Sequence, residues 1–270
     1  MAAPDGTAPR TALVLGGGGS RGAVGVGLYR ALVELGVKID MLVCCSIGAV
    51  NGALIAAGMS PEELEASWRA LRTRDVLGSR LQFLRLFVGA TSLFNNKSLR
   101  ALLSRQLPVR TFHELRIPLS IVTTDLETGD SVVLVEGDLI EAILASTALP
   151  GLFPPIELQG RRLVDGGLSN NVPIDLAVAL GAERVIGMLC GCAKGLPSRA
   201  NMITVLGQSF SLAINARYRC DSRMYQPRAH LHILDPCLQP TLELLDFDRG
   251  WLLMEPAYQC ALQALRHQLT

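Results

Sequence analysis

The chain has 270 residues, of which 49% are hydrophobic and 18% are charged, and its formal net charge is +1. This apolar balance excludes a disordered chain and fits a large buried core with some lipid-facing surface. A net charge so close to zero gives no basis for bulk electrostatic binding to nucleic acid.

The first two predicted strands each end in a turn of small residues. An apolar strand at 12–15 runs into the glycine-rich turn 16–22, and a helix follows to about Leu35. A second strand at 41–43 leads into Cys44-Cys45-Ser46-Ile47-Gly48, and a helix follows Ser46 as far as Gly58. The glycine turn offers a row of backbone N–H groups that suits an anion. The second turn exposes one serine hydroxyl, so the pair predicts an acyl hydrolase.

The next segments predict helices that cover the sheet. Ser60, Pro61 and Glu63 form a capping-box start for a helix that ends near Leu71. Residues 80–107 interleave leucine and phenylalanine with arginine. This pattern fits either an amphipathic cap over the active site or helices that pack on the core.

Strands and helices then alternate to the end of the chain, which predicts an α/β fold with a mainly parallel sheet. No stretch is typical of a linker, so we expect one domain over residues 1–270, with a motif-bearing core at about 11–177 that residues 178–270 complete. The predicted strands are 119–123, 131–134, 162–164, 184–189 and 230–234, and the predicted helices are 138–146, 173–180, 201–218 and 251–269.

The first ten residues are short and polar and lack the apolar stretch of a secretory signal. Seven cysteines without such a signal predict reduced thiols in a cytoplasmic protein, with contact at a membrane periphery still open. Cys190-Gly191-Cys192 has too few companions for a zinc site. The least polar run, 41–59, divides into a strand and a helix, so we interpret it as buried core and not as a membrane span.

Ser46 requires a base, and the residues alone leave two kinds of candidate open. Asp165 ends a predicted strand and precedes Gly166 and Gly167, so a serine could approach its carboxylate closely. Such a base needs good orientation and a raised pKa. His230 and His232, which flank one residue of a later strand, are the alternative.

A nucleotide site is a competing interpretation of the glycine turn. Gly17, Gly19 and Gly22 satisfy the spacing of a dinucleotide-binding fingerprint between a strand and a helix. However, the acidic residue expected at the end of the second strand is missing, because that strand ends at Ser46. No Lys-Ser or Lys-Thr follows the glycines, which excludes a phosphate loop of the Walker type.

Five stretches in order along the chain resemble the patatin-like phospholipase family in its compact bacterial form. They are LVLGGGGSRGAVGVGLYRAL (13–32), SIGAVNGALIAAG (46–58), TTDLETGD (123–130), ASTALPGLFPPIEL (145–158) and LVDGGLSNNVPIDLA (163–177). The resemblance implies a three-layer α/β/α fold with a mainly parallel central sheet, and acyl esters of lipids as substrates. It also implies that the protein uses no metal and no cofactor.

The same resemblance assigns roles to residues. It implies a Ser–Asp dyad with Ser46 as nucleophile and Asp165 as base, without a histidine. It implies an oxyanion hole made by the backbone N–H groups around Gly17, Gly18 and Gly19. Further residues would support the site or help orient the substrate; these are Arg21, Gly48, Gly166 and Gly167.

One residue departs from the family pattern Gly-x-Ser-x-Gly. Cys44 stands at its first position, and only Gly48 remains of the two glycines. Glycine gives steric room to a strained turn, so a thiol there fits only where it can point into free space. The alternative function is therefore a catalytically weak or inactive protein that binds lipid or acts as a regulator.

Overall fold

A computed structural model gives the structure of the chain and describes residues 9–78, 92–190, 202–236, 238–240 and 242–269. The strands are β1 (Thr11–Leu15), β2 (Met41–Cys45), β3 (Leu119–Asp125), β4 (Ser131–Leu134), β5 (Ile156–Leu158), β6 (Arg161–Asp165), β7 (Arg184–Met188) and β8 (His230–Leu234). The helices are α1 (Val24–Glu34), α2 (Ile47–Ala56), α3 (Pro61–Ala70), α4 (Thr73–Leu77), α5 (Lys97–Gln106), α6 (Leu139–Ser146), α7 (Gly167–Asn170), α8 (Ile174–Ala179), α9 (Met202–Tyr225) and α10 (Met254–Leu269). Short 3-10 helices are η1 (Gly19–Ala23), η3 (Phe112–Glu114) and η4 (Gly250–Leu253).

The strands form one mixed sheet in the order β5-β6-β3-β2-β1-β7-β8, with β4 also paired to β3. The run from β3 to β8 is parallel throughout, whereas β4, β5 and β6 pair antiparallel. The predicted α/β class with a mainly parallel sheet is therefore confirmed. β1 and β2 lie at the centre, with Leu15 opposite Cys44, so the turns that follow them are neighbours.

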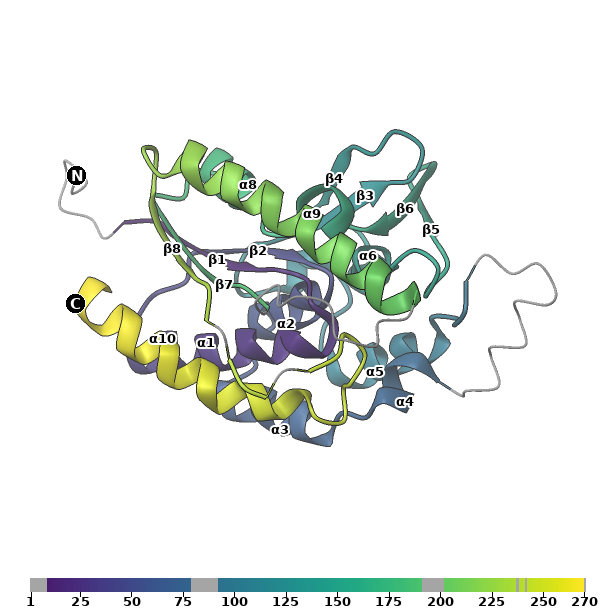
Figure 1. Cartoon of the computed structure of the whole chain (residues 1–270), viewed down its shortest axis with the longest axis horizontal. Helices are drawn as coiled ribbons and strands as arrows, with labels where there is room; N and C mark the ends of the chain where they lie inside the picture. Colours follow the sequence, from purple (N-terminus) through teal and green to yellow (C-terminus); the bar gives the residue numbers. More distant parts are fainter. Residues whose placement is uncertain (1–8, 79–91, 191–201, 237, 241, 270) are drawn as a thin grey trace.

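Alternating side chains on the central strands build a core on each face of the sheet. Leu13 and Leu42 belong to the core under α1, α2 and α10. Ala12 and Val43 belong to a second, smaller core with residues of α8 and α9. Figure 1 shows the same arrangement, with α1, α3 and α10 below the sheet and α8 and α9 across its other side. The helices therefore form two layers around the sheet, as the resemblance implied.

Several predicted elements match closely, and others have structural reasons to differ. Ser60 and Glu63 form the predicted capping box of α3. α5 lies within the predicted amphipathic stretch and buries Leu99, Leu102 and Leu103, so this part packs on the core. Residues 79–91 of the same stretch lie outside the described residues. β5, α4 and α7 were not predicted, because three to five residues carry too short a periodic pattern.

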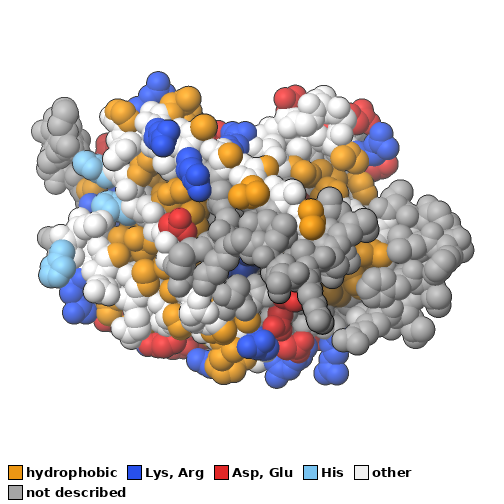
Figure 2. Space-filling model, viewed as in Figure 1, with side chains coloured by type: hydrophobic (Ala, Val, Ile, Leu, Met, Phe, Trp, Pro, Cys, Tyr) orange, Lys and Arg blue, Asp and Glu red, His pale blue; other side chains and the backbone are white. Residues whose placement is uncertain are grey.

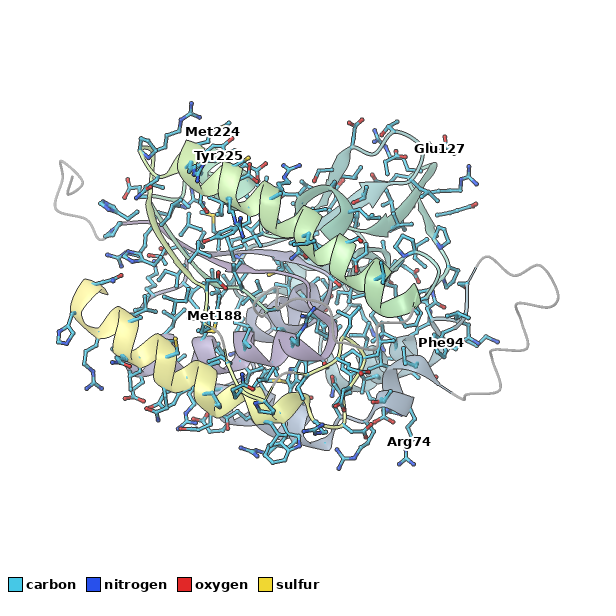
Figure 3. All side chains as sticks on the ribbon, viewed as in Figure 1. Arg74, Phe94, Glu127, Met188, Met224 and Tyr225 are labelled. Carbon is cyan, nitrogen blue, oxygen red and sulfur yellow. The ribbon has the colours of Figure 1, made fainter. Side chains whose placement is uncertain are left out.

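α9 extends seven residues beyond its predicted end and lies on α7 and α8. At its C-terminal end, Tyr225 packs toward the second core while Met224 is 59% exposed (Figure 3). No helix within the described ranges combines the length and the apolar character needed to cross a bilayer.

Candidate active site

Ser46 lies at a strained turn between β2 and α2. Its φ of 53° and ψ of −128° fall in a region that non-glycine residues rarely adopt, at a cost of roughly 1–3 kcal/mol. Its backbone N–H donates to Ser146 Oγ at 2.8 Å, and that hydroxyl donates to the Val122 carbonyl at 2.6 Å. The surrounding structure thus holds the serine in this conformation at the carboxyl edge of the sheet.

Gly48 lets α2 begin directly against the end of β1. A Cβ at this position would lie 2.0 Å from the carbonyl oxygen of Leu15 and 2.9 Å from that of Gly16. Backbone atoms cannot move aside as a flexible side chain can. The glycine two residues after the serine is therefore a packing requirement of the turn.

Asp165 reaches Ser46 because the chain after β6 passes very close to β3. A Cβ on Gly166 would lie 2.2 Å from the Val122 carbonyl oxygen, so no side chain fits there. Ser46 Oγ donates to Asp165 Oδ2 at 2.6 Å. The other carboxylate oxygen, Oδ1, accepts from the Gly167 N–H at 2.8 Å and lies 3.9 Å from Cys45 Sγ. The structure thus brings together the two residues expected to form the dyad.

Burial changes the acidity of this carboxyl group. Asp165 is 4% exposed, and desolvation raises its pKa from the ordinary value of 3.8 to about 6. The hydrogen bonds from Ser46, Gly167 and Cys45 oppose this effect, because they stabilise the charged form. The group is ionised at neutral pH, yet it is a better proton acceptor than an ordinary carboxylate.

Cys44 and Cys45 point to opposite sides of β2. Cys45 Sγ lies beside Asp165, whereas Cys44 Sγ lies over α2, where a Cβ on Gly52 would be 2.4 Å from it. Both side chains are 0% exposed, and burial raises the pKa of each thiol far above its usual range. The thiol that replaces the family's glycine therefore fits into space on the α2 side, away from Asp165.

The glycine turn lies between Ser46 and a residue that the sequence analysis did not single out. A Cβ on Gly17 would lie 2.8 Å from Ser46 Cβ and 2.5 Å from Asn171 Oδ1. The Gly17 N–H donates to that Oδ1 at 3.0 Å. For the N–H groups of Gly18 and Gly19, the structure shows no acceptor among the residues that it describes. Two donors of the expected oxyanion row are thus available in this part of the chain.

The far end of the turn is fixed by a distant segment. The Ser20 N–H donates to the Leu244 carbonyl at 2.8 Å, and Ser20 Oγ donates to the Glu243 carbonyl at 2.7 Å. Gly19 has a φ of +56°, and a Cβ there would meet the Leu244 oxygen at 2.0 Å. Arg21 Nε donates back to the Gly18 carbonyl at 3.3 Å. Residues 243–244 lie outside the stretches that carry the family resemblance.

His230 and His232, the alternative bases, lie away from Ser46. β8 is separated from β2 by β7 and β1, and His232 Nδ1 is 2.8 Å from Gln268 Oε1.

No group of three or more potential metal ligands occurs in the described ranges. Gly191 and Cys192 of the Cys190-Gly191-Cys192 stretch lie outside them.

Sequence reasoning missed three contributors to this site. Ser146, the last residue of α6, and Asn171, which follows α7, both occur in quoted stretches, but a single polar residue at the end of a helix carries no periodic signal. Residues 243–244 contribute backbone carbonyls only, so their residue types reveal nothing.

Comparisons with known proteins place this geometry in context. A family model described as patatin-like phospholipase matches residues 13–178. Mouse patatin-like phospholipase domain-containing protein 7 is 37% identical over 183 residues, which cover 67% of this chain and 13% of that protein. An uncharacterized NTE family protein of Mycobacterium tuberculosis is 33% identical over 230 residues, or 85% of this chain and 61% of that protein. This chain thus spans only part of the length of these relatives.

A similar fold occurs in the solved structure of human GIVD cytosolic phospholipase A2 in complex with a methyl γ-linolenyl fluorophosphonate inhibitor and terbium chloride. The TM-score is 0.51 and the sequence identity 15%, over 96% of this chain and 59% of that one. At this identity the likeness concerns the fold alone.

Proposed function

The chain belongs to the patatin-like phospholipase family, and on this premise we propose that it is a serine acyl hydrolase that cleaves acyl esters of lipids. One observation carries the proposal: the Ser46 hydroxyl, at a positive-φ turn, donates at 2.6 Å to the buried carboxylate of Asp165. The mouse relative named above is a phospholipase domain protein, which supports lipid esters as the substrate class.

In the first step, Ser46 Oγ attacks the carbonyl carbon of the ester, and Asp165 Oδ2 takes the hydroxyl proton as the new bond forms. The negative charge that develops on the carbonyl oxygen is met by the N–H groups of Gly18 and Gly19. The C–O bond to the alcohol then breaks, and the alcohol leaves with the proton from Asp165. The acyl group remains on Ser46.

In the second step, Asp165 accepts a proton from water, whose oxygen attacks the acyl carbon. The same N–H groups stabilise the second oxyanion. Collapse of this intermediate breaks the bond to Ser46 Oγ, which recovers its proton from Asp165, and the fatty acid leaves. The pKa of about 6 for Asp165 suits both proton transfers near neutral pH.

The experiment that tests the proposal is labelling with a fluorophosphonate probe, read by mass spectrometry. We expect a modified Ser46 in the wild type, no modification at this position in Ser46→Ala, and much slower labelling in Asp165→Asn. Circular dichroism checks that each variant is folded. A folded wild type that stays unlabelled would favour the lipid-binding alternative, and labelling at the normal rate in Asp165→Asn would overturn the assigned base.

The alternative of an inactive protein rests on Cys44, and its thiol has room over Gly52 without displacing the dyad. The packing therefore supports the active interpretation. A cytoplasmic location stays a prediction, in keeping with the free thiols of Cys44, Cys45 and Cys190.

We also propose that the enzyme contacts the membrane surface through α9. Val205 and Leu212 on this helix are 42% and 54% exposed. Arg219 and Arg223 are exposed too, and among the described residues neither has an acidic partner. Figure 2 shows hydrophobic side chains along the position of α9, with Lys or Arg side chains toward its upper left end. Exposed apolar side chains beside unpaired arginines suit an anionic lipid surface.

A further inference from the structure

Asn171 connects three parts of the site without touching the reacting atoms of the dyad. It follows α7 and lies six residues after Asp165, the residue that accepts from Ser46. Its side-chain Oδ1 accepts from the Gly17 N–H at 3.0 Å, and its Nδ2 donates to the Gly17 carbonyl at 3.4 Å. The same Oδ1 lies 3.8 Å from the thiol sulfur of Cys45, the residue before the nucleophile.

We propose that Asn171 is the positioning residue of the oxyanion site: its side-chain amide pairs with Gly17 and thereby aims the Gly18 N–H at the substrate oxygen. This inference rests on the proposed function and deepens it. It divides the expected row of donors into a structural one, the Gly17 N–H, and two that remain for the oxyanion, those of Gly18 and Gly19.

The planarity of the peptide bond links Asn171 to the Gly18 donor. The Gly17 carbonyl and the Gly18 N–H belong to one trans peptide, so they point in opposite directions. A donor that holds the carbonyl on the Asn171 side therefore turns the Gly18 N–H to the other side. The orientation of the amide is fixed by its partners, because a flipped Asn171 would place its NH2 against the Gly17 N–H.

Glycine makes such a clamp necessary. Residues 16–19 are four consecutive glycines, whose backbones populate many conformations and permit a peptide to flip. The segment is fixed at its far end by the two hydrogen bonds from Ser20 to residues 243–244. Asn171 fixes the other end of the segment, at Gly17, which packs directly against Ser46. The donors between these two points are then preorganised, which is the property that stabilises a transition state.

The neighbouring asparagine offers a matched control. Asn170 is 3% exposed and donates from Nδ2 to Asp175 Oδ1 at 2.7 Å, away from the glycine turn. Replacing either asparagine by alanine deletes the same atoms from the same short segment. Both variants lose stability, but only Asn171→Ala frees the Gly17 peptide.

The test measures kcat and KM for hydrolysis of p-nitrophenyl butyrate by the full chain. We expect Asn171→Ala to lower kcat by about 10²-fold, the effect of one lost oxyanion donor, with KM changed less than threefold. Asn170→Ala keeps kcat within threefold of the wild type. Asn171→Asp keeps an acceptor for the Gly17 N–H but loses the donor to its carbonyl, so we expect its kcat to fall as well at pH 8.

Equal kcat values in Asn171→Ala and Asn170→Ala would overturn the proposal, as would a loss confined to KM. If Asn171→Ala does not fold, Asn171→Asp decides alone, and a wild-type kcat in that variant overturns the proposal. Failure of the proposed function is distinct, because the wild type itself would then show no turnover and no labelling of Ser46.

Discussion

The sulfur of Cys44 fills the space that Gly52 leaves open on the facing surface of α2. A Cβ on Gly52 would lie 2.4 Å from Cys44 Sγ and 3.3 Å from Cys44 Cβ. The cysteine is fully buried, and its thiol lies on the side of β2 opposite Asp165. The departure from Gly-x-Ser-x-Gly is thus accommodated within the core and leaves the hydrogen bond between Ser46 and Asp165 intact.

This relationship predicts strong coupling between the two positions in a double-mutant cycle. Cys44→Gly deletes a buried side chain and adds backbone freedom, so we expect the free energy of unfolding to fall by about 1–3 kcal/mol. Gly52→Ala alone forces its new methyl group against the sulfur. In the double variant the methyl group takes the vacated space, so the destabilisation should be smaller than the sum of the two single effects.

Urea denaturation measures the three free energies, and p-nitrophenyl butyrate hydrolysis shows whether Cys44→Gly changes turnover. Additive effects would show that the two side chains do not share this space. A marked increase of kcat in Cys44→Gly would show that the thiol restrains catalysis, contrary to the geometry.

The sequence predicted the central strands well because they are apolar, local and followed by distinctive turns. β1 and β2 fall within two residues of their predicted bounds, and Ser46 and Asp165 stand where the turn chemistry placed them. The contribution of Asn171 could not be predicted, because its side chain contacts Gly17 across 154 positions of the chain and no turn or periodic pattern marks the residue. The same holds for the carbonyls of residues 243–244, since a backbone atom leaves no trace in residue type.

The raised pKa of Asp165 predicts the pH dependence of catalysis. The base must be ionised, so we expect kcat/KM for p-nitrophenyl butyrate to rise with pH and to level off above an inflection near 6. A histidine base would give a similar profile. A double variant with His230→Ala and His232→Ala distinguishes the two kinds of base, because it removes both histidines of β8 and keeps Asp165. The double variant should keep the profile. An inflection below about 4.5, or loss of activity in the histidine variant, would contradict the assignment.

Asp165→Asn should separate stability from catalysis. A carboxyl group whose pKa is higher in the folded than in the unfolded state makes the fold lose stability as the pH rises from about 4 to above 6. The asparagine variant lacks this cost. We expect its free energy of unfolding to equal or exceed that of the wild type at pH 8, with the advantage shrinking toward pH 4. Urea denaturation at both pH values measures the difference in the free energy of unfolding between the variant and the wild type. A difference that favours the variant less at pH 8 than at pH 4 would contradict the prediction.

Gly48→Ala should damage both the fold and the site. The new methyl group would meet the Leu15 carbonyl at 2.0 Å, which only a shift of α2 relative to β1 can relieve. We expect a loss of at least about 2 kcal/mol in the free energy of unfolding and little remaining activity. Gly25→Ala is the control. Gly25 lies within α1, and its new methyl group would be 3.2 Å from the flexible side chain of Leu15 and not from a backbone atom. Similar stability of the two variants would refute the packing argument.

The exposed face of α9 predicts binding to anionic membranes. Leu212→Asn removes an apolar side chain that is 54% exposed, and Arg219→Glu with Arg223→Glu reverses two charges that have no acidic partner among the described residues. In sedimentation with phosphatidylcholine–phosphatidylglycerol vesicles, we expect each change to weaken binding several-fold, since a basic residue near such a surface contributes about 1 kcal/mol. All variants carry Ser46→Ala so that the vesicles remain intact.

Val33→Asn is the control for this experiment, because Val33 is 48% exposed on α1, across the sheet from α9. Its substitution should leave vesicle binding unchanged. Equal loss of binding in Val33→Asn and Leu212→Asn would mean that no single face is responsible. Binding that persists on pure phosphatidylcholine and in the arginine variant would show that apolar contact alone holds the protein on the surface.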